Sequence, residues 1–182
     1  MRAVIDENPQ QKSFVGAVDI LKVELSLFWQ RSIFFWGFIA ASFIGYGVLI
    51  RDHKELALAI SCFGLTCSLA WTLINRASKR WHENWLYKVQ QMERVVFGSD
   101  TFSRLDEPDS PSTWWGGWRY SVTKLTIALS DFAVLIWIAL VYKAAIASTL
   151  DLYSAAILVV TVLYLLAILF GCRSKRRIQG KE

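Results

Sequence analysis

The stretch that decides the fold is residues 56–97, which begins LALAISCFGLTCSLAWTLI (56–74) and continues NRASKRWHENWLYKVQQMERVVF (75–97). Its first half is apolar and its second half is charged. No proline interrupts it, and Gly64 is its only glycine. The pattern therefore predicts one continuous helix, half in lipid and half in the cytoplasm. At about 1.5 Å per residue such a helix is roughly 63 Å long, about twice the thickness of a bilayer core.

The composition is that of a membrane protein. Of 182 residues, 54% are hydrophobic, and they are clustered in long runs rather than spread along the chain. Cys62, Cys67 and Cys172 lie in or beside these runs without CxxC spacing, so they predict packing residues and neither a zinc site nor a disulfide framework. The two histidines, His53 and His82, are isolated from other candidate ligands or catalytic groups. We therefore expect no metal, no cofactor and no enzymatic activity.

Three further apolar segments, 32–50, 123–141 and 152–172, are long enough to be transmembrane helices. Five polar residues, 51–55, join the first two spans, and such a short turn makes those spans antiparallel neighbours. Ahead of them, residues 13–31 are expected to form an amphipathic helix. Its apolar face is Phe14, Val18, Leu21, Leu25 and Phe28.

The fold class predicted is an all-α polytopic membrane protein. It has four transmembrane helices, an N-terminal amphipathic helix, and a long second helix that extends into the cytoplasm. The expected segments are a flexible tail (1–12), a cytoplasmic amphipathic helix (13–31), a transmembrane hairpin (32–75), a cytoplasmic helix with an acidic, Trp-rich loop (76–120), a second transmembrane hairpin (121–172) and a basic cytoplasmic tail (173–182).

Two surfaces are candidates for an oligomer interface. Small residues that recur every four positions in the first span allow another helix to approach closely. A stripe of large apolar residues on the cytoplasmic helix needs a partner, because it cannot all face water. The partner is either the 13–31 helix or another copy of the chain. The small-residue face is Gly37, Ala41 and Gly45, and the stripe is Trp81, Trp85, Val89, Met92 and Val96.

Two polar residues, Ser130 and Asp131, fall inside the third span. An ionised Asp at the bilayer centre costs about 2.5–3.5 kcal/mol, so Asp131 is expected to face protein or water. Two interpretations remain open, a polar contact between helices and a water-filled path. Tryptophans are favoured at membrane–water interfaces. The predicted interface anchors are Trp114, Trp115 and Trp118 at the inner face and Trp137 toward the outer face.

The distribution of basic residues predicts the orientation. With both termini in the cytoplasm, only Arg51, Lys54 and Lys143 of the 20 Lys and Arg residues lie outside. Basic residues just inside the spans also suit anionic lipid at the inner face, so the basic tail does not indicate nucleic acid.

Several motifs resemble the RipA-like family of small octameric bacterial inner-membrane proteins. They are FWQRS (28–32), Trp71 and Asn75 at the end of the second span, SKRWHENWLYKVQQME (78–93), YSVTK (120–124) and Trp137. The resemblance implies a four-span homo-oligomer, an octamer, in a bacterial inner membrane, linked to envelope and stress- or host-associated fitness and with no enzymatic activity to carry over. The first half is also similar to the two-span effector modules of bacterial antiphage systems, from which the second pair of spans sets this chain apart.

Two functions follow from these observations as expectations. The first is a homo-oligomeric scaffold or channel-like assembly with a cytoplasmic helical layer, in which Asp131 would repeat once per subunit. The alternative is a membrane-anchored sensory or effector subunit that binds a cytoplasmic protein through the loop and the Trp-containing stripe.

Overall fold

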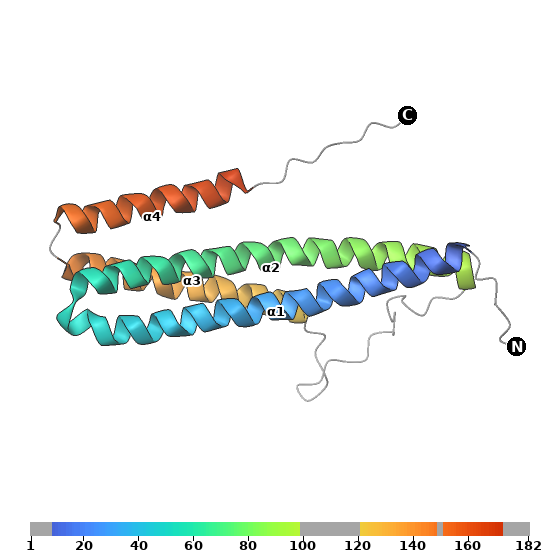
Figure 1. Cartoon of the computed structure of the whole chain (residues 1–182), viewed down its shortest axis with the longest axis horizontal. Coiled ribbons are helices and arrows are strands. Elements are labelled where there is room, and N and C mark those ends of the chain that lie inside the picture. The colour runs from blue at the N-terminus through green and yellow to red at the C-terminus, as the bar shows by residue number, and fades with distance from the viewer. Residues whose placement is uncertain (1–8, 99–120, 149–150, 173–182) are drawn as a thin grey trace, which may run out of the picture. The chain divides into compact units, whose positions relative to one another are not determined.

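The computed structural model describes residues 9–98, 121–148 and 151–172, and every regular element in these ranges is an α-helix (Figure 1). The helices are α1 (Pro9–Asp52), α2 (Lys54–Phe97), α3 (Val122–Ala147) and α4 (Leu152–Gly171). Within these ranges, four helices are long and apolar enough to cross a membrane. The predicted all-α polytopic membrane fold is therefore confirmed.

Helices α1 and α2 have the same length. Each has 44 residues, which corresponds to about 66 Å. The single helix predicted from residues 56–97 lies within α2. The sequence did not predict that the amphipathic segment and the first span are also one helix, α1. That helix begins at Pro9, a favoured first helical position, so residues 9–12 belong to α1 and not to the predicted tail.

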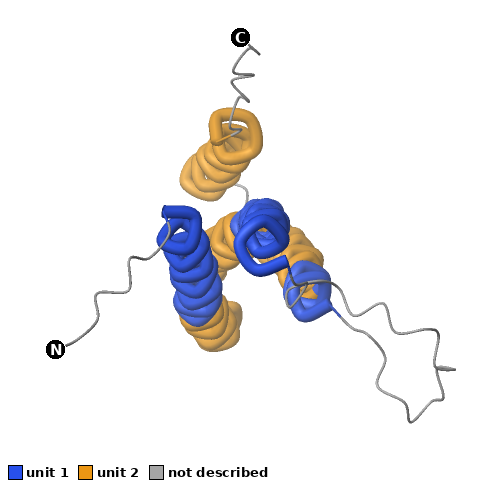
Figure 2. Tube along the Cα trace, turned by 90° about the vertical axis from the view of Figure 1, so that its right-hand side faces the viewer, with its two compact units in different colours: residues 1–34, 73–128 blue, residues 35–72, 129–182 orange. Residues whose placement is uncertain are grey.

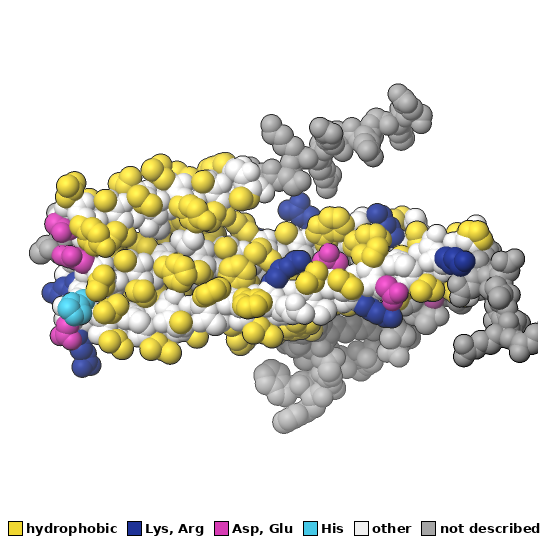
Figure 3. All heavy atoms as spheres, in the orientation of Figure 1, with side chains coloured by type: hydrophobic (Ala, Val, Ile, Leu, Met, Phe, Trp, Pro, Cys, Tyr) yellow, Lys and Arg dark blue, Asp and Glu magenta, His cyan; other side chains and the backbone are white. Residues whose placement is uncertain are grey.

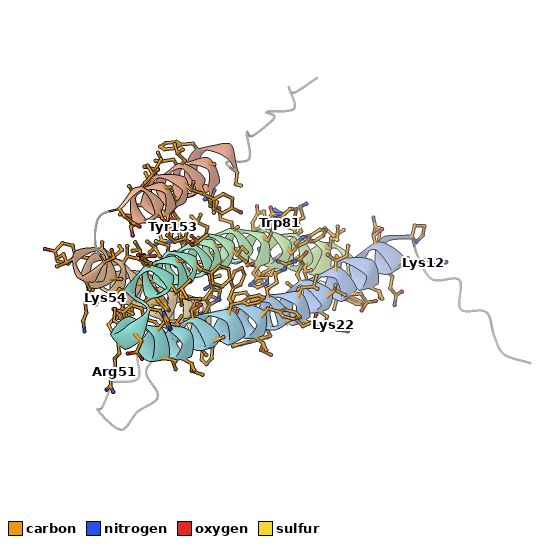
Figure 4. All side chains as sticks on the ribbon, turned by 60° about the vertical axis from the view of Figure 1, so that its left-hand side comes forward. Lys12, Lys22, Arg51, Lys54, Trp81 and Tyr153 are labelled. Atoms are coloured by element: carbon orange, nitrogen blue, oxygen red, sulfur yellow. The ribbon has the colours of Figure 1, made fainter. Side chains whose placement is uncertain are left out.

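The connection between α1 and α2 is shorter than the predicted five-residue turn. Helix α1 continues to Asp52 and α2 begins at Lys54, which leaves only His53 between them. The His53 N–H donates to the Leu49 carbonyl at 2.8 Å, and the Ala57 N–H donates to the His53 carbonyl at 2.9 Å. Arg51 and Lys54, on either side of this turn, are labelled in Figure 4. Helix α3 is likewise longer than predicted and continues past Lys143 to Ala147.

The chain divides into two compact units, shown in different colours in Figure 2. The described residues of unit 1 are 9–34, 73–98 and 121–128. Those of unit 2 are 35–72, 129–148 and 151–172. Each unit thus contains one half of α1, one half of α2 and part of α3, and unit 2 also contains α4.

In unit 1, the two helix halves run antiparallel and pack through aromatic rings. Phe14 near the start of α1 meets Phe97 at the end of α2, with ring centroids 5.2 Å apart, and Phe28 meets His82 at 5.6 Å. Phe28 is 4% exposed and Val89 is fully buried. One series of buried and half-buried positions of α2 recurs at spacings of three and four, as in an antiparallel coiled coil. It comprises Asn75, Ser78, His82, Trp85, Val89, Met92 and Val96, while Lys79, Gln90 and Glu93 are buried or half-buried outside this series.

Unit 2 has a continuous apolar core. Residues from α1, α2 and α3 form it, and side chains from α4 pack against it. Several hydroxyls in this unit bond back to carbonyls of their own helix, which satisfies them inside an apolar environment. Examples are Ser42 to Phe38 at 2.8 Å and Ser61 to Leu58 at 2.8 Å. The buried core residues are Ile39, Tyr46, Ala57, Leu58, Cys62, Cys67, Trp71, Trp137 and Ala144.

Candidate functional site

The small-residue face of α1 is divided between two environments. Gly45 is half-buried, and a Cβ at this position would lie 3.6 Å from the Ile60 side chain of α2. Gly37 and Ala41 are exposed, and a Cβ at Gly37 would meet nothing within 4 Å. Gly45 therefore contributes to packing within unit 2, whereas Gly37 and Ala41 leave a smooth surface open to another helix. Their role in an oligomer interface stays a prediction.

The apolar stripe of α2 in unit 1 is largely covered within the chain. Val89 is fully buried, and Trp85, Met92 and Val96 are half-buried on the same face. The antiparallel half of α1 is the partner on this face, which was one of the two partners expected from the sequence. Because these residues already have a partner, most of the stripe is unavailable to a second copy.

Trp81 differs from the rest of the stripe. Its side chain is 54% exposed, and its ring stacks on that of Trp85, with centroids 6.5 Å apart and planes 16° apart. The Lys88 Nζ lies 4.7 Å from the centroid of the Trp85 ring, a cation–π distance. Trp81, labelled in Figure 4, thus extends a stacked aromatic pair out of the α1–α2 contact. Of the five stripe residues, it has the most surface left for an additional contact.

Sequence reasoning missed three residues of this buried face, Asn75, Ser78 and His82. Asn75 is 1% exposed and Ser78 is 4% exposed. Their side chains are polar, and a pattern of large apolar residues does not include them. A signal was present, because residues 75, 82, 89 and 96 recur every seven positions, which is the repeat of two packed helices.

The structure places Trp137 in the core of unit 2 and not at a membrane interface. Its side chain is fully buried and stacks on Phe43, with ring centroids 4.4 Å apart. It also lies so close to Gly64 that a Cβ there would be 2.5 Å from the indole ring. This corrects the prediction of an outer interface anchor. An outward-facing tryptophan and one that packs against a glycine look alike in a single apolar segment. The other predicted anchors, Trp114, Trp115 and Trp118, lie outside the described residues.

The polar pair of α3 belongs to unit 2. Ser130 is fully buried and Asp131 is half-buried. Both residues interact with other groups of the chain. Both interpretations of this pair, a polar contact between helices and a water-filled path, stay predictions.

Possible metal ligands and thiols among the described residues are the next feature of the chain. Within residues 9–98, 121–148 and 151–172, no group of three or more His, Cys, Asp or Glu residues could hold a metal ion. Cys62 and Cys67 are buried and Cys172 is exposed, all three as free thiols. The features that stand out are helix surfaces for contact with lipid or protein. On the face shown in Figure 3, hydrophobic side chains cover α4 along its length.

Comparison with protein families identifies a match that covers most of the chain. Residues 12–172 match the model of the octameric membrane protein family (8xMP). Comparisons with curated proteins and with solved structures gave no significant match. The matched range contains all four helices apart from the first residues of α1. Since the family model covers most of the chain and the four apolar helices agree with it, this chain belongs to the octameric membrane protein family and is a self-associating membrane protein.

Proposed function

We propose that the chain is the subunit of a homo-octameric scaffold in a bacterial inner membrane, with a layer of paired helices on the cytoplasmic side. The observation that carries this proposal is the length of α1 and α2. Each is about 66 Å long, while a bilayer core is about 30 Å thick, so about half of each helix extends beyond the hydrocarbon. Unit 1 holds these halves together through Phe14, Phe28 and Val89.

A scaffold fits these contacts better than a catalyst or a channel. The buried residues of unit 1 include Phe28 and Val89 together with the polar residues Asn75, Ser78 and Glu93. The packing of rings between α1 and α2 favours a structural role without catalytic chemistry or a cofactor. Ser130 and Asp131 interact within the chain, whereas a channel-like assembly would need their polar groups to face a shared path. For this reason the scaffold is our first proposal, and the channel-like assembly is secondary to it.

The cytoplasmic placement of unit 1 rests on charge. In the proposed orientation both termini lie inside, and the turn at His53 and the residues around Lys143 lie outside. Lys79, Arg80 and Lys88 then lie on the inner side, where anionic lipid headgroups attract basic residues.

One observation favours a second candidate, the binding of a cytoplasmic protein. Unit 1 retains exposed apolar residues on α2 after the α1–α2 contact has formed, including Trp81 at 54%, Tyr87 at 59% and Val95 at 70%. Large apolar residues exposed to water mark interaction surfaces when they lie together. In a scaffold, either neighbouring subunits or a membrane-associated sensory or effector partner would cover them.

The test of the proposal is the native mass of the full chain, purified from membranes in mild detergent. Eight chains of 20.8 kDa have a mass of about 166 kDa. We expect native mass spectrometry to show this species as the main oligomer. The proposal would be contradicted if the main species of the full chain in mild detergent were a monomer or a dimer.

A further inference from the structure

Helix α4 has few contacts within its own chain. Ser154 is the one buried residue of α4, a helix that the structure describes completely. In the most apolar 18-residue window of each helix, 6% of the residues of α4 are buried, compared with 11% in α3, 17% in α1 and 50% in α2. In lipid an apolar side chain is not forced inward by water, and close van der Waals packing holds helices together. Most of the surface of α4 is therefore available for packing against something outside the chain.

A groove runs along one side of α4 within unit 2. It has a volume of about 630 Å³ and is lined mainly by α2 and α4. Where the two helices meet, Cys62 of α2 contacts the Thr161 hydroxyl of α4. Tyr153, labelled in Figure 4, lies near the start of α4 and is the first α4 residue of the lining. The small residues of the lining are Ala59, Cys62, Cys67 and Ala70 on α2 and Ala156 on α4.

The lining of the groove is suited to an apolar occupant. None of its residues is charged. Its two threonines donate their hydroxyls to their own helices, Thr66 to the Cys62 carbonyl at 2.9 Å and Thr161 to the Ile157 carbonyl at 2.7 Å. These two donors are therefore already used, and the hydroxyls of Tyr153 and Tyr164 are the remaining ones in the lining. A polar solute would lose its hydrogen bonds to water and regain few in the groove.

We propose that side chains of a second copy of this chain fill the groove between α2 and α4. The inference rests on the proposed homo-octamer, because each chain of an oligomer must bury surface against its neighbours. Two features favour a second copy over a lipid chain. Small residues on α2 and α4 permit the close approach that helix association in membranes requires. The scarce contacts of α4 are also those of a helix that completes its packing in the assembly.

The proposed contact also fits a closed ring. A concave groove cannot pack against an identical groove, so its occupant must be a different surface of the neighbouring chain. Such head-to-tail contacts repeat around an axis and close into a ring when the rotation fits.

Two valines of α4 provide a matched pair for the test. Val160 lines the groove and is 64% exposed, whereas Val162 is 54% exposed and is not part of the lining. They are two positions apart on the helix, which corresponds to about 200° around its axis. We expect Val160→Trp to fill the groove and replace the octamer by smaller species in native mass spectrometry, while Val162→Trp leaves the octamer intact. An octamer that survives Val160→Trp would overturn the inference.

A second measurement avoids dependence on the folding of the tryptophan variant. The photoreactive amino acid p-benzoylphenylalanine is placed at position 160 or 162 of the full chain, and the membranes are irradiated before any detergent is added. We expect covalent dimers from position 160 and lipid adducts from position 162. Lipid adducts alone at position 160 would show that a lipid chain occupies the groove, which would overturn the inference. In either experiment, a wild-type octamer would leave the proposed scaffold standing even if the groove proposal failed.

Discussion

At the scale of the residue, Gly64 sets how closely α3 approaches α2 in unit 2. The indole ring of Trp137 occupies the space that a side chain at position 64 would need. Trp137 also stacks on Phe43 of α1, so one buried ring contacts all three helices. A glycine within a helix costs about 0.5–1 kcal/mol relative to alanine, and here the close contact with Trp137 offsets that cost.

The first prediction concerns Gly64→Ala. The added methyl would lie 2.5 Å from Trp137, and rigid neighbours limit how far the ring can move. We expect a loss of about 1–3 kcal/mol in the free energy of unfolding, the usual range for overpacking. The measurement is the midpoint of denaturant-induced unfolding in detergent.

The control for this prediction is Gly47→Ala on α1, where an added Cβ would meet nothing within 4 Å. That variant should be neutral or slightly more stable, because alanine is the better helix former. Equal losses of stability in the two variants would contradict the specific role of Gly64.

Asp151 is the N-cap of α4 and carries a prediction about pH. Its Oδ1 accepts the Ser154 N–H at 2.9 Å, and this hydrogen bond lowers the pKa of the carboxyl below its ordinary value of 3.8. A carboxyl with a lower pKa in the folded state stabilises the fold when it is charged. Its contribution is therefore present at neutral pH and is lost as the pH falls through the folded-state pKa.

We expect Asp151→Ala to weaken the first turn of α4 at neutral pH, because an N-cap carboxylate satisfies a free helix N–H. The difference from the wild type should shrink as the pH falls from neutral through the lowered pKa of Asp151, because the wild-type carboxyl then becomes protonated as well. Hydrogen exchange of the residues in that turn, corrected for the intrinsic rate at each pH, measures the effect. A difference that stays the same as the pH falls would show that the charge is not involved.

At the scale of the element, the pair Trp81 and Trp85 tests whether unit 1 contributes to assembly. Trp81 is the stripe residue that α1 leaves most exposed. We expect Trp81→Ala combined with Trp85→Ala to lower the oligomeric mass in mild detergent without preventing membrane insertion, because truncation of buried aromatic anchors removes much of the energy of an interface. Glu83→Ala, which changes an exposed polar residue on the same helix about 200° around its axis from Trp81, is the control. An unchanged octamer in the double variant would exclude this surface from the subunit contact.

Elements were easier to predict from the sequence than contacts. The helix at residues 56–97 could be recognised because its hydrophobic period is uninterrupted by proline, and the four spans because their apolar runs reach the length of a bilayer. The α2 face that packs on α1 was only partly recognised. Trp81 was assigned to it on hydrophobicity, whereas Ser78 and His82 occupy that face in the structure. In a membrane protein, lipid accepts apolar side chains on any face, so hydrophobicity alone does not distinguish a packed face from a lipid-facing one.

Because lipid accepts apolar side chains on any face, neither the burial of Trp137 nor the groove between α2 and α4 could be predicted from hydrophobicity. Which surface of an apolar helix meets another helix depends on small residues and on shape, and these are properties of a pair of helices and not of one segment. Gly64 was visible in the sequence, but its partner on α3 was not. Contacts between copies of the chain are harder still to predict from the sequence, because the contacting surface of each copy must be known.

At the scale of the whole molecule, the orientation in the membrane can be tested with native and introduced thiols. Cys172 is exposed at the end of α4 and should face the cytoplasm, and His53 is exposed at the α1–α2 turn and should face outward. With Cys62 and Cys67 replaced by alanine, we expect a membrane-impermeant maleimide to label Cys172 in inside-out vesicles and not in spheroplasts. When Cys172 is also replaced by serine, His53→Cys should give the opposite pattern. The reverse result for both thiols would place the termini outside and contradict the proposed orientation.

The one-residue connection at His53 also restricts how the length of the chain can change. One residue added to or removed from either α1 or α2 rotates everything beyond it by about 100°, which turns a packed face away from its partner. A change of seven residues leaves an offset of only about 20°. We therefore expect related chains to differ in α1 and α2 by blocks of seven residues, added or lost in both helices together. In this protein, insertions and deletions are then tolerated as paired units, and the reach of the hairpin beyond the bilayer changes in steps of about 10 Å.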